Sequence, residues 1–206
     1  MNRPAMGRAP LASLAHCLLL ALLLVSSLSA CTQESSDPTT PAAQGDSSGA
    51  ASLTGAPVAT RTTVHRVYGR LPAPRRKAVR RQVTAVIDGW WESAYLGGRY
   101  PRARFGSTFP GFTRGAEVRA HRDRRLMSNA DIARRVDSVT ARRRTLRLDV
   151  LAVDRVARSV TARFVLRFKT TGEKPGTTVV RGRLFLTRRN GPWQVFGYDV
   201  AKGARA

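Results

Sequence analysis

Apolar residues at helical spacing mark one long amphipathic helix before residue 100. Pro74 suits the first turn of a helix, because the N–H that proline lacks would have no partner there. Large and small apolar side chains then recur every three or four residues, at Val79, Val83, Val86, Trp90 and Ala94, and Ile87 and Trp91 widen the stripe. The pattern predicts a helix from Pro74 to Gly97-Gly98, with this stripe buried.

Weaker signals flank this helix. Ahead of it, residues 62–71 fit either a short strand or a lead-in helix. After it, residues 99–115 form a turn-rich loop with aromatic anchors at Phe105, Phe109 and Phe112. A second helix is predicted from Ala116 to about Met127. A short third one would be capped by Ser128 or Asn129, with Ile132 and Val136 on its buried side.

Strict alternation of apolar and polar residues replaces the helical spacing after residue 140. The alternating apolar positions are Leu146, Leu148, Val150, then Val160, Ala162, Phe164, Leu166, Phe168, then Val180, Leu184 and Leu186. A last strand, residues 193–200, follows the hairpin signal Asn190-Gly191. Strands with short connections predict an antiparallel meander with one buried face.

Helices followed by such a sheet define the expected fold class. The chain should be an α+β protein, in which N-terminal helices pack on a curved antiparallel sheet of four to six strands.

Residues 1–30 have the organisation of an export signal. Arg3 and Arg8 precede an apolar stretch, Leu11 to Leu28, and the run Leu28-Ser29-Ala30-Cys31 closes it. This run resembles the lipobox of bacterial lipoproteins, and the resemblance implies that Cys31 carries the lipid and becomes the mature N-terminus. An uncleaved membrane anchor and an ordinary cleaved signal are the alternatives.

The composition of residues 31–60 differs from that of the rest. Ser, Thr, Pro, Ala and Gly dominate, and large apolar side chains are scarce. Such a segment cannot bury enough surface to offset its ordering entropy, so we expect a disordered tether. The folded domain is expected over residues 61–206. It should lie outside the cytoplasm, on the outer face of the bacterial cell membrane, because the arginines precede the apolar stretch.

The closing strands resemble a known family. Residues 182–187 (GRLFLT) and 191–200 (GPWQVFGYDV) are similar to the closing hairpin of nuclear-transport-factor-2-like or SnoaL-like domains, whose final strand begins with a Gly-x-Trp-x-Val run. The order of elements over residues 62–203 agrees with that family. The resemblance implies a cone in which a curved sheet wraps a long helix, often around a pocket. With its N-terminal segment, the chain also resembles actinobacterial lipoproteins and Mce-associated membrane proteins, which implies a role beside an Mce-type lipid transport complex.

The charge and the cysteine count narrow the set of partners. Thirty-six basic residues against thirteen acidic ones give a formal net charge of +23. Such a charge usually indicates nucleic acid, but an exported protein meets anionic lipid and wall polymer first, so we expect no nucleic-acid partner. Cys17 would leave with the signal, and Cys31 alone can form neither a disulfide nor a cysteine zinc site. His65 and His121 lie far apart in the sequence, so we expect neither a metal nor another cofactor.

Several residues have the chemistry of an isomerase or hydrolase, which would need a carboxylate base and a donor in one pocket. The candidates are Asp88, Glu92, Asp149 and Asp199 as acids and Tyr95 and Tyr198 as donors. Spacing singles out none of them, and no nucleophile elbow, phosphate loop or dinucleotide fingerprint is present. We therefore assign no catalytic residue and expect most carboxylates to form surface ion pairs with arginine. Trp90 is expected in the core, and Trp91 and Tyr95 are the candidate rim of any pocket.

Two groups of basic residues are candidates for anion binding. The first occupies the start of the long helix, at Arg75, Arg76, Lys77, Arg80 and Arg81. Cations there oppose the helix macrodipole, so helix stability does not explain them. The second group, expected on the non-core face of the sheet, is Arg163, Arg167, Arg181 and Arg183. The alternative for both groups is a solvated charged surface that reflects an arginine-rich composition.

Together these features favour a lipid-anchored, extracytoplasmic accessory or binding protein of the cell envelope. A small cone-fold enzyme and a passive binder of anionic polymer or lipid are the alternatives. Two or more polar groups converging in a closed apolar pocket would favour the enzyme. An apolar groove without titratable groups would favour binding of lipid or a partner.

Overall fold

The computed structural model describes residues 57–188 and 191–204. The predicted signal at residues 1–30, Cys31, the predicted tether as far as residue 56, and Asn190 of the predicted hairpin turn lie outside these residues.

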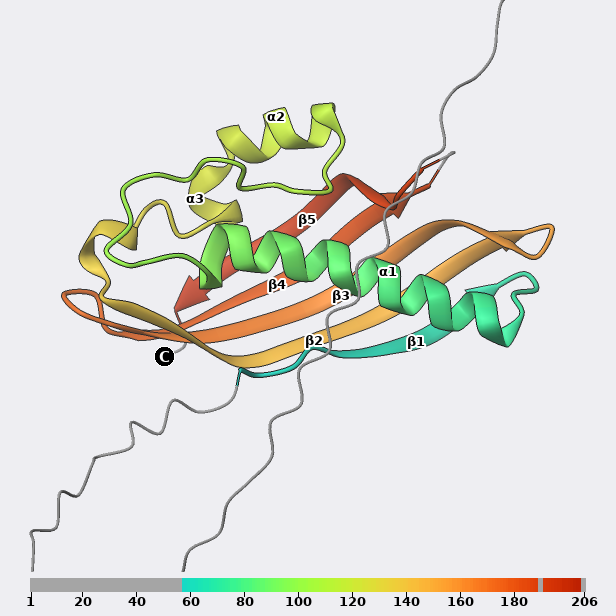
Figure 1. Ribbon diagram of the computed structural model, residues 1–206, viewed down its shortest axis with the longest axis horizontal. Coiled ribbons are helices and arrows are strands. Elements are labelled where there is room, and N and C mark those ends of the chain that lie inside the picture. The colour runs from blue at the N-terminus through green and yellow to red at the C-terminus, as the bar shows by residue number, and fades with distance from the viewer. Residues whose placement is uncertain (1–56, 189–190, 205–206) are drawn as a thin grey trace, which may run out of the picture. The chain divides into compact units, whose positions relative to one another are not determined.

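Five strands form one open sheet in the described residues, in the spatial order β1-β2-β3-β4-β5 (Figure 1). They are β1 (Arg61–Tyr68), β2 (Ser138–Val153), β3 (Val156–Thr171), β4 (Gly176–Thr187) and β5 (Gln194–Ala204). The strands from β2 to β5 pair antiparallel, which confirms the predicted meander. The ambiguous segment at residues 62–71 forms β1, which pairs parallel to β2, so the sheet is not wholly antiparallel. A parallel pair needs a long crossover, and here the whole helical segment provides it.

The helical segment consists of one long helix and several short turns. They are α1 (Ala73–Trp91), the π-helical turn η1 (Glu92–Leu96), α2 (Arg114–Arg122), α3 (Arg124–Met127) and the 3₁₀ turn η2 (Ala133–Arg135). The predicted long helix is confirmed, and its last turn is π-helical up to Gly97. The predicted helix at 116–127 is two helices that join at Asp123. The predicted third helix is only the 3₁₀ turn, which Ile132 (half-buried) precedes and Val136 (fully buried) follows, and neither Ser128 nor Asn129 caps it.

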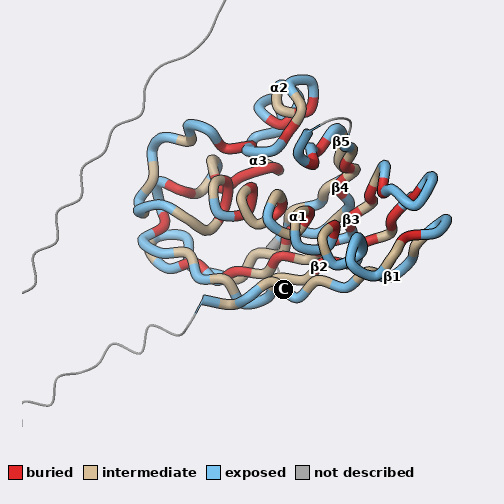
Figure 2. Tube along the Cα trace, turned by 45° about the vertical axis from the view of Figure 1, so that its right-hand side comes forward, coloured by how far each residue is buried: buried red, intermediate tan, exposed pale blue. Residues whose placement is uncertain are grey.

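The helices lie on one face of the sheet, and the core fills the space between (Figures 1 and 2). Trp90 is fully buried, its ring stands edge-on to Phe164 at 5.5 Å, and its indole N–H donates to the Met127 carbonyl. Every residue of the main core cluster lies between Leu71 and Val195. Residues 57–206 therefore contain the whole of this cluster, and we expect them to fold without the preceding segment.

Candidate anion-binding site

One arginine binds the carboxylates of Asp88 on α1 and of Glu92 at the start of η1. The Arg144 guanidinium pairs with Asp88 at 2.8 Å and with Glu92 at 2.6 Å. The Thr60 hydroxyl donates to Asp88 at 2.6 Å and accepts from Arg144 Nε at 2.9 Å. The same guanidinium carbon lies 5.6 Å from the centre of the Trp91 ring. Both acids therefore hold β2 against α1, as partners in an ion-pair network.

The carboxylates on the strands are also paired. Asp149 accepts from His65 Nδ1 at 3.0 Å and from Arg163. Partial burial opposes ionisation of Asp149, but these two hydrogen bonds outweigh it, and its pKa is lowered. Asp199 pairs with Arg183 at 2.6 Å. All four candidate acids thus contact arginine, which fits the expected role in ion pairs.

The two candidate donors are engaged elsewhere. The Tyr95 hydroxyl is in the core and donates to the Leu126 carbonyl at 2.6 Å, and burial raises its pKa well above the ordinary value. The Tyr198 hydroxyl donates to Asp123 at 2.7 Å, and burial together with this acceptor raises its pKa. The Tyr95 hydroxyl therefore holds α3 against the end of the long helix, and the Tyr198 hydroxyl holds the α2–α3 junction against β5.

Trp91 and Tyr95 are both fully buried. They occupy core positions rather than a pocket rim. Arg144 covers Trp91 from the β2 side, and the segment around α3 covers Tyr95. The sequence could not show this, because both covering groups are distant along the chain.

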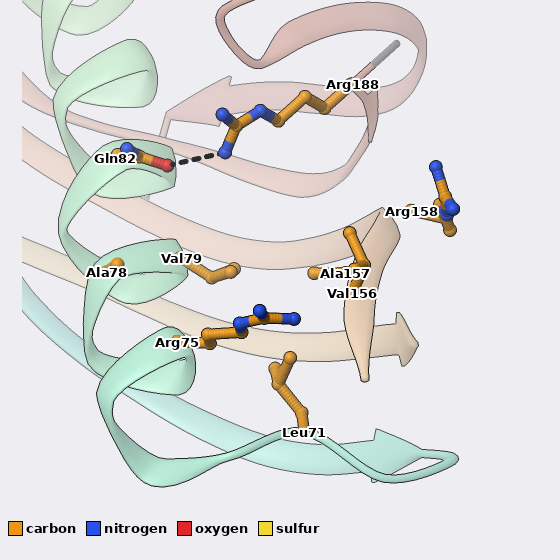
Figure 3. Close-up of a pocket in the computed structure, with 9 residues that line it drawn as sticks. All are labelled: Leu71, Arg75, Ala78, Val79, Gln82, Val156, Ala157, Arg158 and Arg188. Atoms are coloured by element: carbon orange, nitrogen blue, oxygen red, sulfur yellow. Dashed lines mark hydrogen bonds between the residues drawn. The ribbon is translucent and has the colours of Figure 1, made fainter. Parts of the chain in front are cut away.

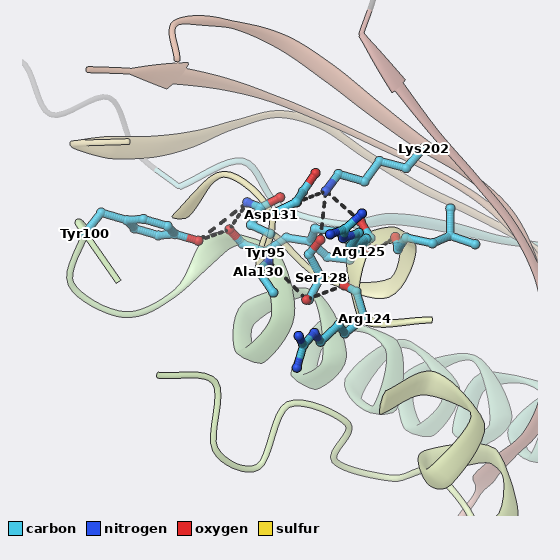
Figure 4. A network of polar contacts seen from close by, with 10 residues as sticks. Tyr95, Tyr100, Arg124, Arg125, Ser128, Ala130, Asp131 and Lys202 are labelled. Carbon is cyan, nitrogen blue, oxygen red and sulfur yellow. Dashed lines mark hydrogen bonds and ion pairs between the residues drawn. The ribbon is translucent and has the colours of Figure 1, made fainter. Parts of the chain in front are cut away.

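The side chain of Lys202 on β5 is only 10% exposed and takes part in a network of polar contacts (Figure 4). Its ammonium donates to the carbonyls of Arg125 and Ser128 at 3.0 and 2.8 Å and pairs with Asp131 at 2.7 Å. Burial lowers its pKa, although Asp131 opposes that effect. All three ammonium donors have partners, so Lys202 fastens β5 to the segment after α3.

The basic cluster at the start of α1 is exposed, as expected, but the helix divides it. Arg76, Lys77 and Arg80 line a shallow groove between α1 and β1. Arg75 faces the other side, where its guanidinium donates to the Arg155 carbonyl in the β2–β3 turn at 2.7 Å. Arg81 lines neither groove.

A second groove lies between α1 and the β2–β3 hairpin, and we call it the α1–hairpin groove (Figure 3). Its volume is about 370 Å³. Its lining has an apolar part, a glutamine and three arginines, namely Leu71, Ala78, Val79, Val156 and Ala157, then Gln82, then Arg75, Arg158 and Arg188. The Arg188 guanidinium donates to the side-chain amide oxygen of Gln82 at 3.4 Å. This lining contains three arginines and no carboxylate, histidine, cysteine or tyrosine.

The sequence did not reveal that Arg158 and Arg188 line the same groove as Arg75. Arg158 lies at an irregularity of the β2–β3 ladder, where Ala152 pairs with Ala157 but Leu151 pairs with Ser159. A bulge of this kind redirects side chains, and alternation alone does not predict where it occurs. Arg188 follows β4, and its backbone N–H reaches the Arg158 carbonyl at 3.4 Å.

Exposed apolar side chains gather at the same end of the sheet, which we call the hairpin end. They are Tyr68, Leu151, Val153 and Val156, with exposed fractions of 49, 47, 45 and 38%. Tyr68 pairs with Leu151 across β1 and β2, and Val153 pairs with Val156 across the turn. Arg66, Arg155 and Arg158 are near them along the chain, as is Asp154 in the β2–β3 turn, and the Arg66 guanidinium lies 5.7 Å from the Tyr68 ring centre.

The second basic group lies on the face of the sheet that the helices leave uncovered, as predicted. Arg163 pairs with Arg183 in the β3–β4 register, and both are exposed. Each also has a carboxylate partner, Asp149 or Asp199. The charges of Arg163 and Arg183 are therefore compensated, whereas Arg167 and Arg181 line a shallow groove on this face together with Val165 and Val179.

Two further properties concern the described part of the chain only. Residues 57–188 and 191–204 contain no group of three acidic, histidine or cysteine side chains arranged to hold a metal ion. None of the helices in these residues has the length and apolar character needed to cross a membrane.

Comparison of the chain with protein-family models, with curated proteins and with solved structures gave no match.

Proposed function

We propose that the protein is a lipid-anchored accessory protein of the bacterial cell envelope, whose folded domain rests on the anionic membrane surface through its hairpin end. The observation that carries this proposal is the hairpin end itself. It combines half-exposed apolar side chains, Leu151 and Val153 among them, with neighbouring arginines such as Arg66 and Arg155.

The combination fits a lipid surface better than it fits water. Apolar side chains gain about 25 cal/mol for each Å² that leaves water. Each arginine near an anionic leaflet contributes about 1 kcal/mol, which salt screens. Arginine also buries its apolar stem while its charged head stays at the interface. The two effects act together where apolar tips and arginines share one end of a domain.

The N-terminal segment supports the same proposal. Lipid at Cys31 would hold the chain to the membrane, and a flexible tether of about thirty residues spans roughly 30 Å root-mean-square. Such a tether keeps the domain at a high effective concentration near the surface, so weak contacts at the hairpin end suffice. The domain would then lie on the extracytoplasmic side.

The element order supports a cone-like domain of the nuclear-transport-factor-2-like kind, as the closing hairpin suggests. For that reason we propose that the protein supports a complex of the cell envelope, such as an Mce-type lipid transporter. A binding role fits the α1–hairpin groove, whose lining has no general acid or base that titrates near neutral pH.

Vesicle co-sedimentation of residues 57–206 tests the proposal. Binding to phosphatidylglycerol vesicles should exceed binding to phosphatidylcholine vesicles and should fall as salt rises. The double variant Leu151→Ser, Val153→Ser should bind about tenfold more weakly, because apolar burial is lost. Val118→Ser is the matched control, since Val118 is 47% exposed on α2. Equal binding to both vesicle types, or equal losses in both variants, would contradict the proposal.

A further inference from the structure

The α1–hairpin groove brings together arginines from three separate parts of the chain. Arg75 comes from the first turns of α1, Arg158 from the start of β3 and Arg188 from just after β4. The geometry points to a binding site for one phosphate-bearing alkyl amphiphile, that is, the headgroup and first chain segment of an anionic lipid. This inference rests on the proposed function for the source of its ligand.

The positive charge of the groove lining favours binding of an anion. Three arginines contribute to the lining and no carboxylate does, so no lining residue compensates their charge. Arg75 also opposes the macrodipole of α1, whose first turn carries no acidic residue. A phosphate group would remove both costs, because the planar guanidinium fork matches phosphate oxygens and binds them in pairs.

Two of the arginines are already positioned for this role. Arg75 is fixed by its hydrogen bond to the Arg155 carbonyl, which uses one of the five N–H groups of its guanidinium. Arg188 is fixed by Gln82 on α1 and by the backbone contact between Arg188 and Arg158. Figure 3 shows the Arg75 guanidinium beside Leu71 and Val79 and the Arg188 guanidinium beside Gln82, whereas the Arg158 side chain lies on the far side of Val156 and Ala157. Anchored side chains lose less entropy when a ligand arrives.

The apolar floor of the groove, formed by its buried apolar lining residues, favours binding of an alkyl chain. Leu71, Val79 and Ala157 are nearly buried, with exposed fractions of 5, 5 and 7%, and Ala78 and Val156 extend the apolar surface outward. The volume of about 370 Å³ is near the lower end of the range for small-molecule sites, roughly 300–1,000 Å³. A headgroup with the start of one chain fits that size, whereas the rest of a lipid would stay in the membrane.

Other occupants match the lining less well. No aromatic side chain lines the groove, so a nucleotide would find no surface on which to stack its base. Inorganic phosphate would leave the apolar floor unused. The cationic group of a zwitterionic lipid would meet the arginines and be repelled.

Titration calorimetry of residues 57–206 with n-decyl phosphate, below its micelle concentration, tests the inference. We expect saturable binding of one molecule per chain, with affinity at least tenfold above that for inorganic phosphate and for decyl maltoside. The double variant Arg75→Gln, Arg188→Gln should lose at least tenfold in affinity. Arg114→Gln, Arg122→Gln on α2 removes the same charge outside the groove and should change affinity by less than about twofold at physiological salt, where screening is strong.

A second variant tests the apolar floor. Ala78→Leu keeps good helix propensity and fills the groove, so binding of decyl phosphate should be lost while the melting temperature is retained. The inference is overturned if decyl phosphate does not bind, if decyl maltoside binds equally well, or if the groove and α2 variants lose affinity equally.

The failure of this inference can be told apart from failure of membrane docking. Leu151→Ser, Val153→Ser lies outside the groove lining and should leave decyl phosphate binding in solution unchanged while weakening vesicle binding. A chain that binds vesicles through the hairpin end but does not bind decyl phosphate refutes the groove alone. A chain that binds decyl phosphate but not vesicles refutes membrane docking alone.

Discussion

Arginine has several separate roles in this protein, and each depends on the partners that surround the side chain. Arg144 is only 10% exposed and joins Thr60, Asp88 and Glu92 while covering Trp91. In the α1–hairpin groove, by contrast, arginines gather without a carboxylate. The abundance of arginine in the sequence conceals this difference, because residue type alone does not say where the acids are.

Replacement of Arg144 tests its role in the ion-pair network. Arg144→Met should lower the free energy of unfolding by about 1–3 kcal/mol, since Asp88 and Thr60 lose their partner beneath α1. The exposure of Glu92 keeps the loss below that of a fully buried pair. Urea denaturation measures the change, and Arg142→Met, at an exposed position on the same strand, should change it by no more than about 0.5 kcal/mol. Equal losses would mean that the network does not stabilise the fold.

The elements with a long, regular apolar pattern were predictable from the sequence, and those set by distant contacts were not. α1 and the strands β2 to β4 follow from side-chain spacing, because each has one continuous buried face. β1 has a weaker pattern, since it lies at the sheet edge and pairs with a strand seventy residues or more away. The join at Asp123 and the bulge at Arg158 are local irregularities that spacing does not reveal.

The candidate sites were likewise predictable from the sequence only where they depend on local spacing. The exposed basic cluster of α1 was visible in the sequence, since helical geometry places its members on the surface. The groove was not, because it needs the β2–β3 turn and the end of β4 to meet α1. The prediction that Trp91 lies at a pocket rim was wrong, because Arg144 covers its ring and comes from a strand about fifty residues further along the chain.

Neutralising the start of α1 should leave the fold intact. Arg76, Lys77, Arg80 and Arg81 oppose the macrodipole, and no side chain caps α1. Their replacement by Gln, with Arg75 kept for its contact with Arg155, should leave the melting temperature of residues 57–206 unchanged or raise it. Binding to phosphatidylglycerol vesicles at low salt should weaken in the same variant. A lower melting temperature would show that these cations stabilise the fold, and unaltered binding would remove them from the membrane contact.

At the scale of the whole molecule, we propose that a lipidated N-terminus and a docking domain attach the protein to the same membrane. The two attachments reinforce each other, because a tether limits how far the domain can diffuse from the surface.

The first attachment is tested by lipid labelling of the full chain in a bacterial host. Labelled fatty acid should be incorporated into the parent and into Cys17→Ser, because residue 17 would leave with the signal. Incorporation should be absent in Cys31→Ser, since the thiol that forms the thioether is gone. The two cysteines are the only ones in the chain, so the pair of variants is matched. Labelling that persists in Cys31→Ser would refute lipidation at this position.

The most direct test of the central claim measures how deeply the hairpin end enters the membrane. Residues 57–206 contain no cysteine, so a single spin label can be attached at Val153→Cys or, as a control, at Val118→Cys. On phosphatidylglycerol vesicles, the label at position 153 should become accessible to oxygen and protected from a water-soluble nickel relaxant, whereas the label at position 118 should stay in water. If the label at position 153 remains fully accessible to the nickel relaxant, the domain does not dock through its hairpin end.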